Sequence, residues 1–458
     1  MYLIWSVAWF YLAFTGLISH SDPQALTFGE SRLVYEWTSL DLDWASEAEK
    51  QEAVNNGSFV AERNLVAGIK LYKGEVYLTI PRWRYTSGQP ATLLKVVKVN
   101  GEPKLRPYPD WASQKQGDCR ALQYVQSMEI DPNTGRMYVI DAGRVGLSGQ
   151  EPVLNVCPAK IVVYDLNSDT KIDSYELDEE VVSRNNSFLN DIVLDYVDGV
   201  VRYAYITDVI ESRLHVYDFK SRKGYNLEDP SMKPEFSTNG TVIRINNTDY
   251  TFNGGLDGIA MCPDFEYVYY CPLGGYNLYQ VPTSSLRAGT FGPTTGPRLV
   301  GRKLTQTDGL AHGNRRLYFG MLGLSAVYFW DSLTDIRDQN SSIDKVMMKT
   351  QVKVVEDVER MQWPDTFAFD DDGWLWFVSN RLHLFSSRTM DFTGKHGANV
   401  RVWKVFVNET GYLHQADART RANNGSVGTK FNRSSYLRSS YLYILSICFA
   451  LIIILGLK

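Results

Sequence analysis

An internal repeat is the feature that most constrains how this chain can fold. Each copy has a polar residue, a short alternating strand, a turn rich in Asp, Asn or Gly, and an aromatic strand, a pattern typical of a β-hairpin. The copies are "AGIKLYKGEVYLTIP" (67–81), "VQSMEIDPNTGRMYVIDAG" (125–143), "NDIVLDYVDGVVRYAYITD" (190–208), "LDGIAMCPDFEYVYYCP" (256–272), "TDGLAHGNRRLYFGMLG" (307–323) and "WPDTFAFDDDGWLWFVSNR" (363–381). They recur roughly every 50 to 65 residues, which suits one four-stranded blade with its loops. We therefore predict an all-β fold, a six-bladed β-propeller.

The repeats span most of the chain, so we predict one globular domain over residues 30–410. The segments 32–42 and 399–407 lie at the two ends of this region and both alternate in polarity. Pairing them would close the ring and remove an open sheet edge.

The acidic cluster Asp370, Asp371 and Asp372 poses a choice between a metal site and a turn. It occupies the slot that holds "DPNTG" or "GNRR" in sister repeats, so a tight turn explains it. A calcium loop needs several oxygen ligands at set spacings, which "DDDG" followed by Trp374 does not supply. We predict a turn and no metal.

Both ends of the chain are apolar. Residues 1–21 are interpreted as a secretory signal peptide, with an uncleaved anchor as the alternative. Residues 411–440 form a polar linker before a hydrophobic tail, 441–457, which is either a lipid-anchor signal or a membrane span. We therefore expect a secreted or surface-anchored protein, attached to the membrane through this tail.

Eight Asn-x-Ser/Thr sequons support export to the outside of the cell. The acceptors are Asn56, Asn185, Asn239, Asn246, Asn340, Asn408, Asn424 and Asn432. The net charge of -5 and the lack of a basic run argue against a nucleic-acid partner.

The five cysteines fit an oxidising compartment. Cys448 lies in the tail. Cys119 and Cys157 bracket the second repeat, and Cys262 and Cys271 flank a strand pair, so we predict these as two disulfides. The alternative is that some of them are buried thiols.

The first strand of each blade lines the central channel of a propeller. Residues at the same position, or phase, of each repeat should therefore converge on one ring in that channel. Four carboxylates on one ring would repel unless protons, a cation or a basic ligand neutralised them. The alternative is that they cap strand ends by accepting backbone N–H bonds. The residues at or beside this phase are Gln126, Asn190, Asp191, Asp257, Asp308 and Asp365.

Ordered blocks of this sequence resemble the Yellow / major royal jelly protein family over residues 30–410. The blocks include "GDCRALQYVQSMEIDPNTGRMYVIDAG", "FLNDIVLDYVDGVVRYAYITD", "DGIAMCPDFEYVYYCPLGGYNLYQVP" and "GWLWFVSNRLHLF". The resemblance implies a six-bladed propeller, an insect source and secretion. Some relatives are implicated in pigmentation, a few convert dopachrome, some bind biogenic amines, and others are nutritional or eggshell proteins.

The resemblance also implies that Asn380, in "VSNR", contacts a ligand, since its amide can both donate and accept. Arg381 beside it could bind a carboxylate such as that of dopachrome, although an exposed ion pair explains it equally. We interpret Trp363, Tyr318 and Phe329 as blade packing, and His312 and His383 as structural residues within strands.

Three functions stay open. One is a dopachrome-type isomerase in the melanin and catecholamine pathway of cuticle, eggshell or pigment. Another is a non-enzymatic binder of biogenic amines or a matrix protein, and a third is a calcium-dependent lactonase, although no glutamate lies at the matching phase. The expected partner is a small aromatic amine or catechol-derived ligand. The sequence carries no catalytic triad, P-loop, dinucleotide turn or clustered His/Cys motif, so we expect no cofactor.

Overall fold

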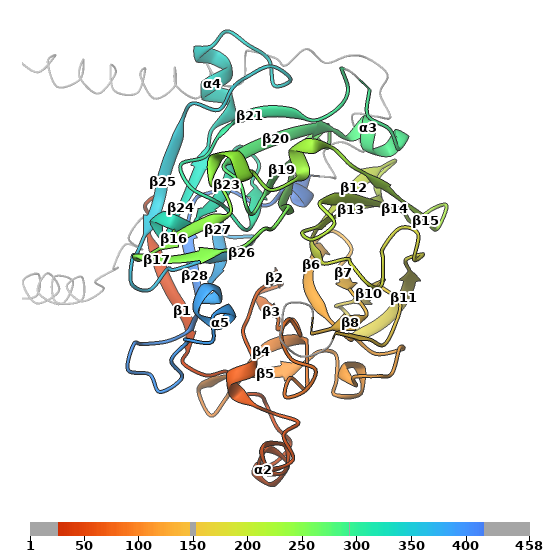
Figure 1. Cartoon of the computed structure of the whole chain (residues 1–458), viewed down its shortest axis with the longest axis vertical. Helices are drawn as coiled ribbons and strands as arrows, with labels where there is room; N and C mark the ends of the chain where they lie inside the picture. Colours follow the sequence, from red (N-terminus) through yellow and green to blue (C-terminus); the bar gives the residue numbers. More distant parts are fainter. Residues whose placement is uncertain (1–25, 147–152, 293, 416–458) are drawn as a thin grey trace, which may run out of the picture. The chain divides into compact units, whose positions relative to one another are not determined.

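The chain forms six four-stranded antiparallel sheets arranged around a common centre (Figure 1). The computed structural model describes residues 26–146, 153–292 and 294–415. The prediction of a six-bladed β-propeller is confirmed. The expected signal peptide (1–21), the tail (441–457) and most of the linker (411–440) lie outside the described residues.

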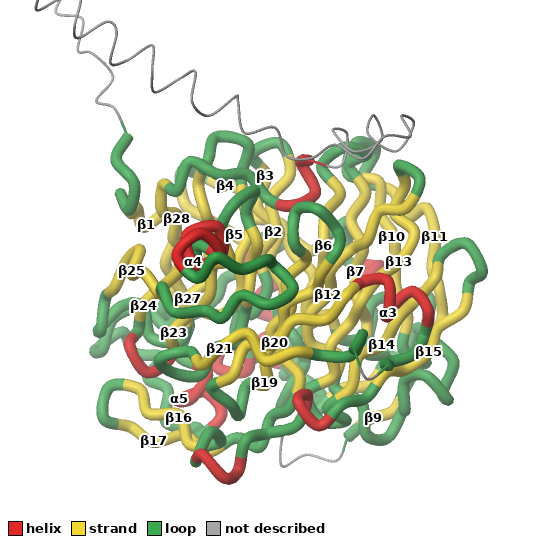
Figure 2. Tube along the Cα trace, turned by 90° about the horizontal axis from the view of Figure 1, so that it is seen from above, coloured by secondary structure: helices red, strands yellow, loops and turns green. Residues whose placement is uncertain are grey.

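Each blade has its first strand innermost, and the tube view of Figure 2 shows that the described parts are mostly strands and loops, with few helices. From the inner to the outer edge the blades are β2 (Ile69–Tyr72), β3 (Glu75–Thr79), β4 (Leu93–Val99) and β5 (Glu102–Pro107); β6 (Val125–Asp131), β7 (Arg136–Asp141), β10 (Lys160–Asp165) and β11 (Thr170–Glu176); β12 (Leu189–Val197), β13 (Val200–Asp208), β14 (Arg213–Asp218) and β15 (Lys223–Leu227); β18 (Leu256–Met261), β19 (Tyr267–Pro272), β20 (Asn277–Pro282) and β21 (Arg298–Arg302); β22 (Leu310–His312), β23 (Leu317–Met321), β24 (Ala326–Trp330) and β25 (Gln351–Glu356); β26 (Pro364–Phe369), β27 (Trp374–Ser379), β28 (Val400–Phe406) and β1 (Ser31–Trp37).

Two small hairpins and a few short helices complete the described parts. The hairpins are β8 (Arg144–Val145) with β9 (Leu154–Asn155), and β16 (Val242–Ile245) with β17 (Thr248–Thr251). The α-helices are α2 (Glu47–Asn55), α3 (Thr283–Ala288), α4 (Ser332–Asp338) and α5 (Leu382–Ser386). Among the described residues, none of these helices has the length and apolar character needed to cross a bilayer.

The ring closes by pairing the first strand of the propeller with its last. β1 lies antiparallel to β28, with Trp37 opposite Val400 and Ser31 opposite Val405. The predicted closure between segments 32–42 and 399–407 is therefore confirmed. Because the two ends of the repeat region pair in one sheet, the sixth blade is complete and the ring of blades is closed.

The acidic cluster of the sixth blade forms the turn between β26 and β27. The Oδ1 atom of Asp370 accepts the backbone N–H groups of Asp372 and Trp374, both at 2.9 Å. Its Oδ2 accepts the indole N–H of Trp376 at 2.7 Å. Gly373 follows with φ of +87°, the left-handed conformation that favours glycine. Asp370 therefore organises the turn with its own side chain.

One of the two predicted disulfides is present. Cys119 and Cys157 are bonded, which confirms that pair. Cys262 and Cys271 are buried free thiols, so the prediction of a second disulfide is wrong. The register explains this: Cys271 lies opposite Gly258, whereas Cys262 follows Met261 at the turn end of the same hairpin. The two cysteines flank the β18–β19 strand pair and therefore lie at its opposite ends.

Two glycines let neighbouring inner strands approach closely. A Cβ atom at Gly258 would lie 2.2 Å from the backbone oxygen of Asp308, and one at Gly309 would lie 2.0 Å from that of Asp365. The N–H of Gly309 donates to the same Asp365 oxygen at 2.8 Å. Each glycine directly follows an aspartate, so the "DG" dipeptides bring the aspartates of three successive blades side by side.

We predict that Gly309→Ala destabilises the propeller by about 1–3 kcal/mol, since the new methyl group must displace backbone rather than a flexible side chain. Gly411→Ala is the control, because the nearest atom to its Cβ would be 3.5 Å away. Urea unfolding of both variants measures the difference. Equal free energies of unfolding for the two variants would contradict the close approach.

Candidate functional site

The inner strands open at their N-terminal ends into a pocket, which we call the acidic mouth. Its volume is about 550 Å³, including space open to solvent. Most polar groups come from the starts of the inner strands or from the residues just before them, while Arg84 comes from a loop and Ser386 from α5. Aromatic groups come from the loops, the β16–β17 hairpin and α5. The lining residues are Trp83, Arg84, Gln126, Phe188, Asn190, Tyr250, Phe252, Asp257, Leu273, Asp308, Trp363, Asp365, Leu382, Phe385 and Ser386.

Three buried aspartates form the base of the acidic mouth. Each carboxylate accepts a hydrogen bond from a different side chain. Asn190 Nδ2 donates to Asp257 Oδ1 at 2.9 Å. Trp363 Nε1 donates to Asp308 Oδ2 at 2.6 Å, and Asn380 Nδ2 donates to Asp365 Oδ2 at 2.7 Å. The carboxylates are therefore held in place before any ligand arrives.

The three carboxyl groups share protons because they are buried together. Burial raises the pKa of Asp257 and of Asp365 well above the usual range, and the charge of Asp308 adds to the shift at both. Burial also raises the pKa of Asp308, while hydrogen bonds from Asp257 and Trp363 oppose that rise. Of the three carboxyl groups, Asp308 is therefore the one that ionises most readily.

Asn380 stands behind the acidic mouth and does not line it. Its Nδ2 donates to Val66 O at 2.9 Å as well as to Asp365, and its Oδ1 accepts the N–H of Leu382 at 2.9 Å. These bonds occupy both ends of the amide. Asn380 therefore orients Asp365 and the start of α5, a positioning role in place of the expected direct contact.

Arg381 turns away from the acidic mouth. Its guanidinium donates to His396 O at 2.5 Å and to Asn399 Oδ1 at 3.3 Å. The cation that does line the pocket is Arg84, which donates to Phe385 O at 3.0 Å and also to Ser386 O. Arg84 follows the fainter first repeat (67–81), in which no polar residue marked the shared position.

The predicted ring separates into two sets. Gln126, Asn190, Asp257, Asp308 and Asp365 line the acidic mouth, whereas Asp191 lines a cavity at the opposite end of the channel. The register of β12 shifts between Leu189 and Ile192. The inner strands β6, β18 and β26 shift at the same place, so Asn190, and not Asp191, is the residue of β12 at the position held by Gln126, Asp257 and Asp365 in their blades.

Aromatic residues form the walls of the mouth, and the sequence interpretation missed most of them. Trp363, interpreted as blade packing, also donates to Asp308 and lines the pocket. Tyr250 meets its ring edge-on at 5.7 Å. His383 lies in α5 rather than in a strand, and its ring stacks on Trp363 at 6.2 Å. Burial lowers the pKa of His383 to about 4, so it is neutral at pH 7.

The other packing predictions agree with the structure. Tyr318 and Phe329 belong to one buried cluster between blades. His312 lies in β22, as expected, and it faces the cavity at the opposite end of the channel.

The fold and the site together define a six-bladed propeller with an acidic, aromatic-walled mouth. The family model described as "Major royal jelly protein" matches residues 124–411. The chain belongs to this family. It is 26% identical over 382 residues to "Protein yellow" of Drosophila yakuba and, equally, of Drosophila melanogaster, covering 78% of this chain and 66% of each relative. The aligned region thus spans just under two thirds of those relatives.

A solved structure titled as a luciferin-regenerating enzyme is also similar, with 13% identity, a TM-score of 0.41, and coverage of 77% of this chain and 96% of that one. These values are too low to carry an argument about this protein.

We predict that the acidic mouth makes the wild-type protein less stable as the pH rises. A carboxyl whose pKa is raised in the folded state contributes its stability fully below the unfolded pKa of about 3.9, and loses it as the pH passes through the folded value. The double variant Asp257→Asn/Asp365→Asn should lose less stability over this range, since Asp308 and Asp191 still have raised pKa values. Urea unfolding between pH 4 and 9 measures it. Asp372→Asn, at an exposed turn position, is the control, and parallel curves for wild type and the double variant would contradict the shared protons.

Proposed function

We propose that the acidic mouth binds small protonated aromatic amines of the catecholamine type. The observation that carries this proposal is the set of three buried carboxyl groups surrounded by aromatic walls. A bound cation would replace the protons that the carboxyl groups share. Its attraction to the carboxylates is strong because the pocket is partly dry, and charges interact more strongly there than in water. The rings of Tyr250, Phe252 and Trp363 supply apolar surface for the aromatic part of the ligand.

The mouth is poorly suited to anions. Arg84 already donates from Nη1 to two backbone carbonyls of α5, so fewer of its N–H groups are left for an incoming carboxylate. The three aspartates repel an anionic ligand, and this repulsion grows with the number of carboxyl groups that are ionised. The proposed ligand is therefore a cation or zwitterion, and its role would lie in the melanin or catecholamine chemistry of cuticle, eggshell or pigment.

A catalytic role, as a dopachrome-type isomerase, is the second candidate. It is favoured by three buried carboxyl groups in one pocket, since burial raises the pKa of Asp257 and Asp365 further than that of Asp308. An isomerisation removes a proton from one ligand atom and returns one to another, and a positioned acid or base contributes about 10²- to 10⁴-fold in rate. Dopachrome decay that is no faster with wild type than with Asp308→Asn would remove this candidate.

Isothermal titration calorimetry tests the binding proposal. Dopamine should bind wild type, and Asp308→Asn should weaken it at least about tenfold, since one unit charge near the amine is worth on the order of 1–4 kcal/mol. The control is Asp372→Asn, which removes a carboxylate at an exposed turn outside both ends of the channel and should leave dopamine affinity unchanged.

Two outcomes would contradict amine binding. One is no heat with dopamine, and the other is equal affinity for wild type and Asp308→Asn. Calcium binding that is lost in Asp308→Asn, without amine binding, would instead favour the calcium-dependent lactonase. No glutamate is among the residues that line the acidic mouth.

We also propose that the protein is exported and glycosylated, and attached to the cell surface through its tail. The six sequon asparagines within the described residues are all exposed: Asn56, Asn185, Asn239, Asn246, Asn340 and Asn408. Asn424 and Asn432 lie outside the described residues. The Cys119–Cys157 disulfide suits an oxidising compartment. Unchanged gel mobility after glycosidase treatment of the protein from secreting cells would count against export.

A further inference from the structure

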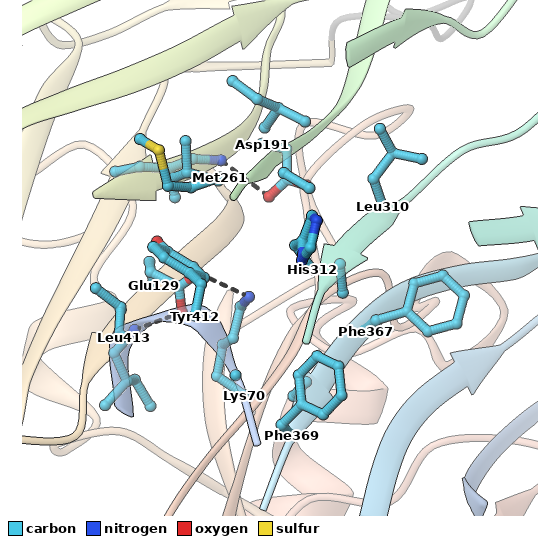
Figure 3. Close-up of a pocket in the computed structure, with 18 of the residues that line it drawn as sticks. Lys70, Glu129, Asp191, Met261, Leu310, His312, Phe367, Phe369, Tyr412 and Leu413 are labelled. Atoms are coloured by element: carbon cyan, nitrogen blue, oxygen red, sulfur yellow. Dashed lines mark hydrogen bonds and ion pairs between the residues drawn. The ribbon is translucent and has the colours of Figure 1, made fainter. Parts of the chain in front are cut away.

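A second cavity lies at the opposite end of the channel from the acidic mouth. Its volume is about 660 Å³, including space open to solvent, and it is lined by the later residues of the inner strands and by the segment Gly411–His414. Figure 3 shows its labelled residues, which include Lys70, Glu129 and His312. None of the functions proposed above uses it.

The segment 411–414, which begins the short helix η6 (Tyr412–Gln415), is fixed across this end by contacts with several blades. The hydroxyl of Tyr412 accepts the N–H of Leu194 at 2.9 Å and donates to Glu129 Oε2 at 3.4 Å. Leu413 O accepts a bond from Asn133 Nδ2 at 3.0 Å, and His414 Nε2 lies 2.7 Å from Asp371 Oδ1. The cavity is therefore a built feature with an ordered wall.

His312 presents an unused hydrogen-bond acceptor in this cavity. Its Nδ1 lies 2.7 Å from Gly313 O. A carbonyl can only accept, so Nδ1 carries the proton and Nε2 of the neutral ring keeps a lone pair. Burial lowers the pKa of His312, which keeps the ring neutral. Nε2 has no hydrogen-bond partner among the described residues, and the ring is held by stacking on Tyr269 at 5.7 Å.

Asp191 supplies a second acceptor. Its Oδ1 accepts the hydroxyl of Ser127 at 2.8 Å and the N–H of Ile192 at 2.9 Å, while its Oδ2 accepts no bond from the described residues. Burial raises the pKa of Asp191 to about 6, and the charge of Lys70 opposes that rise. The carboxyl is therefore largely ionised at pH 7 and can accept a hydrogen bond from a ligand.

The remaining charges in the cavity are paired. Lys70 Nζ lies 3.1 Å from Glu129 Oε2. The other walls are mostly apolar and include Met261, Leu310 and Phe367. The cavity thus differs from the acidic mouth: one carboxylate faces one ion pair. Beside the remaining N–H groups of Lys70, it offers the unused acceptors of His312 and Asp191, which need a donor.

We propose that this cavity is a second ligand site, which takes a small neutral aromatic molecule bearing hydroxyl donors, that is, a phenol. The ring lies against the apolar walls, and its hydroxyl groups donate to His312 Nε2 and to Asp191. An aromatic molecule without a donor would leave both acceptors unsatisfied in a partly dry cavity, so it binds less well.

Methyl NMR of protein labelled at methionine tests this site, with phenol as the probe. Met261 lines the second cavity and no methionine lines the acidic mouth, so its methyl signal, assigned with Met261→Leu, reports on this cavity. Phenol should shift it saturably, and anisole, which has the same ring but no donor, should bind more weakly. His312→Phe keeps an aromatic ring but removes the acceptor, and should weaken phenol binding about 3- to 10-fold.

Asp308→Asn is the control, because it alters only the acidic mouth and should leave the phenol response of Met261 unchanged. The proposal is overturned if phenol gives no saturable shift, if anisole binds as tightly as phenol, or if Asp308→Asn abolishes the shift. The comparison of phenol with anisole needs wild type alone, so it stands even if His312→Phe fails to fold. Failure here leaves amine binding at the other mouth untouched, since the two tests use different probes and report on different cavities.

Discussion

The close approach of neighbouring inner strands at Gly258 and Gly309 is the constraint on which the site depends. Without a Cβ atom at these positions, the backbone oxygens of Asp308 and Asp365 can lie against the preceding blade. The aspartate before each glycine is carried into the same small space. A sequence feature that looks like turn chemistry is therefore a packing requirement, and it concentrates carboxyl groups at one end of the channel.

Such a concentration costs free energy unless charge is neutralised. The structure meets that cost with the donors of Asn190, Trp363 and Asn380 and with protons retained by Asp257 and Asp365. The same features prepare the mouth for a cation. The opposite end of the channel is built differently, with one ion pair and unused acceptors, so one channel offers two chemically distinct ends.

Much of the fold could be predicted from the sequence, because alternation and turn residues are local signals. They gave the six blades and the pairing of β1 with β28. The candidate site was predicted only in part. The repeat alignment was one residue out of phase at β12, where Asn190, and not Asp191, matches Asp257 and Asp365. The entry of Tyr250 and Arg84 into the mouth depends on tertiary contacts that no local pattern encodes. The prediction of a Cys262–Cys271 disulfide was wrong because strand register decides which thiols lie opposite each other.

The exchange of protons for a cation is the central claim, and proton release on binding measures it directly. Calorimetric titration of dopamine at pH 7 in buffers of different ionisation enthalpy gives the number of protons released per ligand bound. The account predicts net release by wild type, and little or none by Asp257→Asn/Asp365→Asn, whose side chains hold no titratable proton. Dopamine binding to wild type without proton release, or with uptake, would contradict it.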